Sequence, residues 1–401
     1  MDRAGEIKLL KKLLNYIDTG TTAMAPAPWQ NPVTAYTCPE RHKAEEKILI
    51  RGRPIVMGFS CDWPKPGTWR TDDYAGVPIL TVRGSDGKLR AFLNVCRHRG
   101  AKVADGCGHS ATFTCPYHGW TYGNDGRLRG LPEEATAFPD VRQDRSGLTP
   151  LPLAEKYGMV WVLPTPGKGD GAAADLDIEP WLQGMGPDLA HWKLDTYHFH
   201  AKHVQHEEMN WKILVDTFHE SYHFGFLHKT SLDGILVHNV SDFEPFGENF
   251  RLTYGRPKLE RLPKTPESEW DLMWNTAIVY SLFANTVLVP QGDHMELFRI
   301  FPVAGRPDRA LMETTLYIPK PVANEEERRH WDANLELAVK VITTEDFPAG
   351  RSMQIGFGSG AQTHTIYGRN ELGLMHYHQA VRRALGLPLD TFPTVESQAA
   401  E

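Results

Sequence analysis

The sequence predicts an α+β protein of two domains, a small antiparallel β domain followed by a larger domain that combines an antiparallel sheet with helices. Short β-rich runs alternate with turn signals such as GSDG and GNDG between about residues 48 and 163, which is typical of antiparallel hairpins. Farther along, strand-like runs are segregated from long helical patterns, and this favours α+β over a doubly wound sheet. The length of 401 residues also exceeds the usual span of one hydrophobic core.

Three segments are expected along the chain: residues 1–45 as an N-terminal arm packed on the second domain, 46–165 as the β domain, and 166–401 as the mixed domain. The Pro/Gly/Ala-rich stretch at 164–175 has no apolar periodicity, so it is the predicted linker. The tail after Leu387 is expected to fray.

The N-terminal residues MDRAGEIKLLKKLLNYI predict an amphipathic helix that docks on the body of the protein. The apolar positions at helical spacing are Ile7, Leu10, Leu14 and Ile17. Acidic residues at positions 2 and 6 argue against a signal or transit peptide. The apolar run at 276–289 is interrupted by polar residues and is too short to span a bilayer as a helix, so it is expected to be one buried strand.

Composition excludes several classes of function. The 43 basic and 50 acidic residues are spread along the chain and give a net charge of -7, which argues against binding to nucleic acid or to an anionic membrane. Five cysteines indicate a reducing compartment, by default the cytoplasm. The sequence has no GxGxxG after a strand and no GK[ST] loop, so reducing equivalents are expected to come from another protein.

The stretch CRHRGAKVADGCGHSATFTCPYHGW predicts a first metal site. Two Cys and two His fit either a structural zinc or an iron–sulfur cluster in which two His replace two Cys. Pairing Cys96-x-His98 with the later Cys115-x-x-His118 leaves sixteen residues between the pairs, enough for two separate loops. If Cys107 and His109 formed the first pair instead, only five residues would separate it from Cys115, and Cys96 and His98 would be left without a role. Cys107 and His109 are therefore expected to be ordinary loop residues.

A second histidine pair lies in NWKILVDTFHESYHFGFLH. His223 and His228 are five positions apart, so both can face one metal if a helix ends or bulges between them. Two histidines and a carboxylate would form the facial triad of non-haem iron(II) oxygenases. On these residues alone, ordinary core or surface histidines remain an equal alternative.

The first pattern, CRHRGA…CPYHGWTY, resembles the Rieske [2Fe-2S] motif of ring-hydroxylating oxygenase large subunits. The agreement extends to flanking residues, namely Gly100, Pro116, Gly119, Trp120 and Tyr122. The resemblance implies that Cys96 and Cys115 hold one iron, whereas His98 and His118 hold the other.

The second pattern resembles the mononuclear-iron motif of the same family, in the same order along the chain. The resemblance implies the following site residues: Asn210, Asp216 and Glu220 as catalytic residues, with Glu220 bridging the two metal centres, and His223, His228 and Asp346 as iron ligands. Asp346 is taken from TTEDFPAG. Its neighbour Glu345 points about 100° away on a helix, so Glu345 is the fallback ligand and not a co-ligand.

Membership of this family would make the chain the terminal oxygenase component of a multicomponent system. It implies a Rieske cluster, mononuclear Fe(II), dioxygen, a reductase with or without a ferredoxin, a helix-grip catalytic domain, and a homotrimer with or without a β subunit. The expected substrate is a small organic, aromatic molecule. Glu220 stands where the family usually has Asp, which is associated with quaternary ammonium substrates such as carnitine or betaine. Trp270, Trp274, Tyr280 and Phe283 could then supply an aromatic cage.

A rival of another class is a ligand-binding or electron-transfer module that has no oxygenase activity, because helix-grip folds also make ligand carriers.

Overall fold

The structure is a computed structural model that describes residues 1, 3–141, 143–167, 175–229, 231 and 234–389. Most of the predicted linker and the tail from residue 390 lie outside this part of the chain. The chain divides into two compact units. Unit 1 comprises Met1–Glu45, Leu182–His191 and His198–Glu401, and unit 2 comprises Glu46–Trp181 and Trp192–Tyr197.

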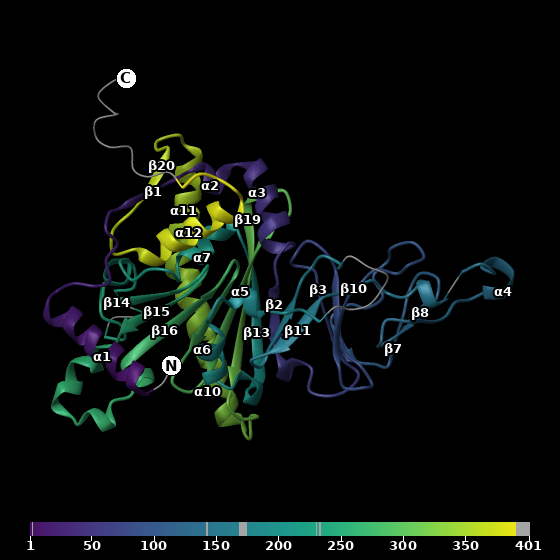
Figure 1. Cartoon of the computed structure of the whole chain (residues 1–401), viewed down its shortest axis with the longest axis horizontal. Helices are drawn as coiled ribbons and strands as arrows, with labels where there is room; N and C mark the ends of the chain where they lie inside the picture. Colours follow the sequence, from purple (N-terminus) through teal and green to yellow (C-terminus); the bar gives the residue numbers. More distant parts are fainter. Residues whose placement is uncertain (2, 142, 168–174, 230, 232–233, 390–401) are drawn as a thin grey trace. The chain divides into compact units, whose positions relative to one another are not determined.

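Unit 2 is built from three small antiparallel sheets, which confirms the predicted β domain (Figure 1). The five-stranded sheet has the order β10 (Pro150–Leu151), β5 (Leu89–Leu93), β4 (Ile79–Arg83), β3 (Thr68–Asp72) and β6 (Cys107–His109). The two three-stranded sheets are β11 (Leu153–Lys156), β12 (Met159–Val162) and β2 (Ile55–Phe59), and β7 (Thr112–Thr114), β8 (Thr121–Gly123) and β9 (Leu128–Gly130).

Tight turns close these hairpins where the sequence signals predicted them. In GSDG, between β4 and β5, Gly87 has φ 79°, a conformation that glycine adopts without strain. In GNDG, between β8 and β9, Gly126 has φ 82° and lies against a ring, since an added Cβ would come 2.3 Å from Phe92. Glycine is therefore required at position 126, because the backbone has a positive φ and because a side chain there would collide with the Phe92 ring.

Unit 1 centres on one seven-stranded antiparallel sheet (Figure 1). Its strands, in spatial order, are β13 (His198–Glu207), β19 (Arg306–Ile318), β18 (Met295–Val303), β17 (Thr286–Pro290), β16 (Thr276–Leu282), β15 (Asn249–Gly255) and β14 (Ser241–Phe246). A separate pair joins β1 (Trp29–Pro32) to β20 (His364–Tyr367). The run at 276–289 is two strands and not one, because the chain turns at residues 283–285 and pairs β16 with β17.

Helices cover this sheet and complete the predicted α+β architecture. They are α1 (Arg3–Asp18), α2 (Thr34–Thr37), α3 (Pro39–Glu45), α7 (Trp211–Asp216), α8 (Phe224–Leu227), α10 (Glu325–Val341), α11 (Phe347–Gly358) and α12 (Leu372–Ala384), with a π-turn η7 (Ile342–Asp346) between α10 and α11. Short helices α6 (Gly186–His191) and α9 (Leu272–Asn275) join them, whereas α4 (Glu134–Ala137) and all but the last residue of α5 (Glu179–Leu182) lie in unit 2. α7 contacts α11, β18 and β19, whereas α12 contacts β15 (Figure 1). No helix in the described ranges is long and apolar enough to cross a membrane.

The N-terminal helix α1 forms as predicted but buries a face rotated from the expected one. Leu9 and Leu13 are buried beside Leu10 and Leu14, while Ile7 and Ile17 are only half-buried. The apolar stripe of this helix is wide enough for either face, so the tertiary contacts decide which residues turn inward.

A buried ionic cluster ties the N-terminal arm to α7. The Lys212 ammonium contacts the Glu45 carboxylate, and both side chains are fully buried. Glu45 also accepts hydrogen bonds from Trp211 Nε1 at 3.1 Å and Arg41 Nε at 3.1 Å. Burial lowers the pKa of Lys212, and the charge of Glu45 opposes that shift. The NWK segment at residues 210–212 therefore forms the N-cap and the first residues of a buried helix.

Replacing Glu45 by Ala is expected to destabilise the chain by about 3–5 kcal/mol, because the buried Lys212 ammonium loses its counter-ion. Urea unfolding followed by circular dichroism measures this change. Glu40→Ala, at an exposed acid in the same helix α3, is the control and should change stability by less than about 0.5 kcal/mol. Equal stability of the two variants would show that Lys212 is neutral or otherwise compensated.

Candidate metal centres

Two loops of unit 2 present the first set of candidate ligands in equivalent conformations. One loop follows β5 and the other joins β7 to β8. In each, the cysteine N–H donates to the carbonyl five residues later at 2.8 Å, and the glycine four residues later donates back to the cysteine carbonyl at 3.0 Å. These glycines, Gly100 and Gly119, have φ of 83° and 74°. The repeated geometry places Cys96 and Cys115 at matching positions, and both side chains are buried.

The histidines of the two loops lie side by side. The rings of His98 and His118 have centroids 4.6 Å apart, and His98 stacks on Trp120 at 5.1 Å. The His98 Nδ1 atom is buried without a hydrogen-bond partner in the described residues. A buried, unpaired ring nitrogen is costly unless a metal takes its lone pair, so these residues fit a cluster held by two Cys and two His.

Cys107 and His109 lie apart from this arrangement. They belong to the short strand β6, where the sequence had suggested a loop, and both are exposed. His109 Nε2 hydrogen bonds the Pro66 carbonyl oxygen at 2.8 Å. Cys115→Ser is therefore expected to abolish the electron paramagnetic resonance signal of the reduced cluster, while Cys107→Ser keeps it in full. A colourless protein that binds zinc in this place would refute the cluster.

The second candidate site is formed by the segment after α7 and by the π-turn η7. His223 and His228 flank α8, a helix of a single turn, with His223 at its N-cap and His228 at its C-cap. The helix therefore begins and ends between them, which is how residues five apart come to face one point. Asp346 closes η7 and is buried.

Three side-chain atoms converge in this site. Asp346 Oδ1 lies 3.3 Å from His228 Nε2 and 3.6 Å from His223 Nε2, and the three ligand atoms lie within 4.8 Å of one another. His223 Nε2 is buried without a hydrogen-bond partner in the described residues. Two imidazoles and one carboxylate facing a common point fit a facial triad, and they fit iron(II) in particular.

The outward nitrogens of both histidines are held by carboxylates. His223 Nδ1 contacts Glu220 Oε1, and His228 Nδ1 contacts Glu345 Oε2 at 2.6 Å. Ser231 Oγ donates to the same Glu345 oxygen at 2.6 Å. Carboxylate partners of this kind fix the tautomer, leaving Nε2 free to bind metal.

The role of Glu345 was missed by the sequence analysis, which treated it only as a fallback ligand. Adjacent residues on a helix do point in different directions, but an imidazole offers two nitrogens on opposite sides of its ring. Asp346 approaches one nitrogen of His228 and Glu345 the other. Burial lowers the pKa of His228, but these two carboxylates outweigh the effect of burial and leave that pKa raised.

A cavity of about 450 Å³ opens beside the triad, entirely within unit 1. Its acidic lining residues are Asp216, Glu220, Asp346 and Glu371, and no Lys or Arg lines it among the described residues. Aromatic and apolar side chains make up much of the remaining wall: Tyr36, Phe357, Tyr367, Ile213, Leu227 and Leu374. The cavity can therefore hold a small organic molecule, and its charge favours a cationic one.

A network of buried polar groups supports the wall near Asp216, and sequence reasoning did not find it. Tyr36 Oη donates to Asp216 Oδ2 at 2.7 Å, and His378 Nε2 lies 2.8 Å from Asp216 Oδ1. Tyr367 and Asn31 extend the network. Burial raises the pKa of Tyr36, as does the neighbouring Asp216 charge. These residues are scattered from position 31 to 378, so no local motif reveals them.

Asn210, predicted as a catalytic residue, is placed as a helix cap. Its Oδ1 accepts from the Lys212 N–H at 3.0 Å, and its Nδ2 donates to the carbonyls of Tyr36 and Pro307. It is buried and does not line the cavity. Its contribution in this structure is to hold α7, which carries Asp216.

The four aromatic residues considered for a cation cage do not line the cavity either. Trp270 and Tyr280 are buried in unit 1, and Trp274 is 56% exposed. The aromatic residues of the cavity are instead Tyr36, Phe357 and Tyr367.

Comparison with protein families identifies both domains of the chain. Residues 54–149 match the Rieske [2Fe-2S] domain, and residues 194–387 match the catalytic domain of the ring hydroxylating alpha subunit. The glycine betaine monooxygenase oxygenase subunit of Chromohalobacter salexigens is 25% identical over 401 residues, covering 86% of this chain and 83% of that protein. The chloroplastic choline monooxygenase of Atriplex hortensis is 26% identical over 357 residues, covering 86% and 76%.

Solved structures share the fold. A quaternary ammonium Rieske monooxygenase in complex with L-carnitine aligns with a TM-score of 0.73 at 21% identity, covering 89% of this chain and 96% of that one. Naphthalene 1,2-dioxygenase from Rhodococcus sp. aligns with a TM-score of 0.70 at 18% identity, covering 94% and 98%. The chain, with its Rieske domain and its non-haem iron catalytic domain, therefore belongs to the family of Rieske oxygenase large subunits.

Proposed function

We propose that this chain is the terminal oxygenase component of a multicomponent system, which uses dioxygen and electrons from a separate reductase to oxidise a small organic substrate. The observation that carries the proposal is the convergence of His223 Nε2, His228 Nε2 and Asp346 Oδ1 beside the 450 Å³ cavity. A protein that only carries an organic molecule would not need three metal-binding atoms that face one point. The same chain also contains the paired Cys-His loops needed to receive electrons.

The residues of the two sites have the following roles in this proposal. Cys96 and Cys115 hold one iron of the Rieske cluster and His98 and His118 the other, while His223, His228 and Asp346 hold the mononuclear iron. When bound, iron(II) in a facial triad supplies open positions at which dioxygen is activated. Glu220 and Glu345 keep the imidazoles in the tautomer that presents Nε2. The apolar cavity walls limit water and orient the substrate.

The substrate class follows from the lining of the cavity. Its apolar wall can accommodate a small aromatic ring, but three carboxylates besides the iron ligand Asp346, with no Lys or Arg among the described lining residues, favour a cation. Tyr36 and Tyr367 add aromatic surface suited to a quaternary ammonium group. The similar monooxygenases named for glycine betaine, carnitine and choline favour the same class. Oxidation of a quaternary ammonium compound is therefore the specific form of the proposal, and hydroxylation of a neutral aromatic is the alternative.

A substrate screen with a surrogate reductase tests both forms. Oxygen consumption and product formation are measured together for trimethylammonium compounds and for small aromatic acids and hydrocarbons. Product formation coupled to oxygen uptake with the first group supports the specific proposal, and coupling with the second supports the alternative. Oxygen uptake without product from either group would contradict the oxygenase assignment for these substrates.

Assembly completes the proposal. A homotrimer, with or without a β subunit, would bring the cluster of one chain to the mononuclear iron of its neighbour in a closed head-to-tail ring. A solved quaternary ammonium Rieske monooxygenase of this fold is described as transferring electrons between subunits. A monomeric form of the present chain is accordingly expected to be inactive.

The pH dependence of ligand binding provides a further prediction. Burial raises the pKa of Glu371 to about 7, and the charges of Glu220 and Asp216 add to this effect. Below pH 7 this carboxyl group is neutral, and above it the cavity gains a negative charge. Once the mononuclear iron has been removed by chelation, choline should therefore bind the protein about fivefold more tightly at pH 8 than at pH 6, equivalent to roughly 1 kcal/mol. Calorimetric titration at the two pH values measures this change, and Glu371→Gln should remove most of it. Affinity that is independent of pH would refute the role of Glu371.

A further inference from the structure

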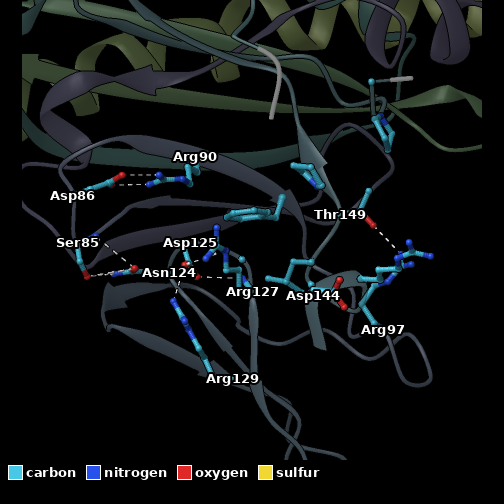
Figure 2. A pocket seen from close by; sticks show the side chains of 18 residues that line it. Ser85, Asp86, Arg90, Arg97, Asn124, Asp125, Arg127, Arg129, Asp144 and Thr149 are labelled. Carbon is cyan, nitrogen blue, oxygen red and sulfur yellow. Dashed lines mark hydrogen bonds and ion pairs between the residues drawn. The ribbon is translucent and has the colours of Figure 1, made fainter. Parts of the chain in front are cut away.

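Unit 2 carries an open pocket of about 1090 Å³ that belongs to neither metal site. Five arginines line it: Arg90, Arg97, Arg127, Arg129 and Arg145. They come from β5, the first cysteine loop, the turn before β9, β9 itself and the segment just before β10. Figure 2 shows four of these side chains distributed along the pocket. We refer to this pocket as the arginine groove.

The arginine groove has a surplus of positive charge, because three aspartates face five arginines. Asp86 is occupied by Arg90 through two contacts of 2.7 and 2.6 Å, and this pairing lowers the pKa of Asp86. Asp125 pairs with Arg129 at 2.6 Å (Figure 2).

The remaining arginines of the groove have little or no carboxylate compensation. Arg127 is 79% exposed and lies 3.9 Å from Asp125, which already pairs with Arg129. Arg97 and Arg145 are exposed and make no ion pair with any described residue. Their charges are therefore available to an acidic partner.

The groove is continuous with the first cysteine loop. Arg97 stands between Cys96 and His98, and its side chain donates to Thr149 Oγ1 at 2.9 Å (Figure 2). Its backbone N–H donates to Tyr122 Oη at 2.9 Å, and that hydroxyl lies 3.3 Å from Cys96 Sγ. A partner seated on Arg97 is thus joined to a cluster ligand by one peptide bond and by a short hydrogen-bonded path.

We propose that the arginine groove is the docking site of an acidic electron-donor protein, and that electrons enter the cluster from its Cys96 side. The inference rests on the proposed function, since it needs the Rieske cluster. The step moves one electron: the reduced iron–sulfur or flavin donor is oxidised, the cluster is reduced, and no bond is made or broken. The exposed ring of His118 then remains free to face the electron acceptor.

The distribution of charge favours a protein over a small anion. The guanidinium groups come from several segments along an extended pocket, whereas a phosphate is best held by donors that converge on one point. A folded acidic surface can match such a spaced pattern, and complementary charge of this kind accelerates association by roughly 10- to 1000-fold at low salt.

The test uses the holoenzyme and an acidic plant-type [2Fe-2S] ferredoxin as the probe donor, whose potential of roughly −400 mV makes reduction of a Rieske cluster favourable. Stopped-flow absorbance follows cluster reduction at low and high NaCl, and calorimetry measures binding of oxidised ferredoxin. The Arg127→Glu/Arg145→Glu variant, away from the ligands, is compared with wild type. Lys65→Glu, at an exposed lysine of the same unit outside the groove, is the control.

The double variant should lose about tenfold or more in ferredoxin affinity and in the low-salt reduction rate, together with most of the salt dependence. The control should match wild type, and reduced methyl viologen should reduce all three proteins equally. Wild-type ferredoxin kinetics in the double variant, or no saturable reduction of the wild type by ferredoxin, would overturn the docking site. Saturable binding of pyrophosphate with unchanged ferredoxin kinetics would assign the groove to a small anion and likewise overturn it. A chain that methyl viologen cannot reduce would refute the proposed function, and the docking with it.

Discussion

His223→Ala and Asp346→Ala are each expected to lose the mononuclear iron and essentially all turnover, while keeping the spectrum of the Rieske cluster. The reason is geometric: three atoms within 4.8 Å of one another are the whole protein contribution to that site in the described residues. Removing an outer partner of a metal ligand already costs about 10- to 100-fold in metal affinity or activity, so removing a ligand should exceed that range. Iron analysis, electron paramagnetic resonance and product assays on the same samples measure the three properties.

Glu345→Gln provides the graded comparison for these variants. A glutamine can still accept a hydrogen bond from His228 Nδ1 but carries no charge, so iron affinity should fall by less than in Asp346→Ala. If Asp346→Ala retained full iron and activity while Glu345→Ala did not, the third ligand would be Glu345 and the assignment of Asp346 would be wrong.

Glu220→Gln is expected to keep both metals and the same oligomer, to accept an electron at the Rieske cluster normally, and to lose most turnover. Glu220 Oε1 contacts His223 Nδ1, and Oε2 accepts the His223 N–H at 3.1 Å. Because the Tyr222 N–H also donates to Oε2, the bridge would use the second lone pair of Oε1, which could accept from His118 of a neighbouring subunit and would join the two metal centres through one carboxylate. Glutamine keeps the size of the side chain but removes the charge that would organise this bridge.

Stopped-flow oxidation of the reduced cluster, in the presence of substrate and dioxygen, separates the bridging role from a structural one. Slow reoxidation with normal iron content supports the bridge. Glu220→Asp, which keeps the charge, should recover part of the rate. Reoxidation at the wild-type rate in Glu220→Gln would leave this residue as no more than a partner of His223.

Much of this architecture could be predicted because its signals are local. The two cysteine loops follow from short spacings and from glycines in left-handed conformations, and the antiparallel hairpins follow from turn residues. The pair His223 and His228 was found for the same reason, together with Glu220 three positions earlier. Each of these relationships lies within a few residues, where backbone geometry leaves few choices.

The unpredicted features depend on contacts between distant segments. Lys212 meets Glu45 across 167 positions, and His228 meets Glu345 across 117. The cavity wall at Asp216 likewise depends on Tyr36 and His378. Local sequence patterns contain no information on such long-range pairs. The helix α1 was predicted correctly, but tertiary contacts determine which of its faces is buried.

The cavity wall is supported by residues that lie far apart in the sequence, and this separation has a consequence for biosynthesis. Tyr367 and His378 are made 331 and 342 residues after Tyr36, and all three meet at one network. Contacts of such long sequence separation form late, after their loops have closed. A nascent chain that has not yet been extended through His378 therefore lacks an enclosed pocket, and Asp346 is added long after the two histidines. The full set of iron ligands exists only once Asp346 has been made, so a shorter nascent chain cannot expose a complete iron site to the cell.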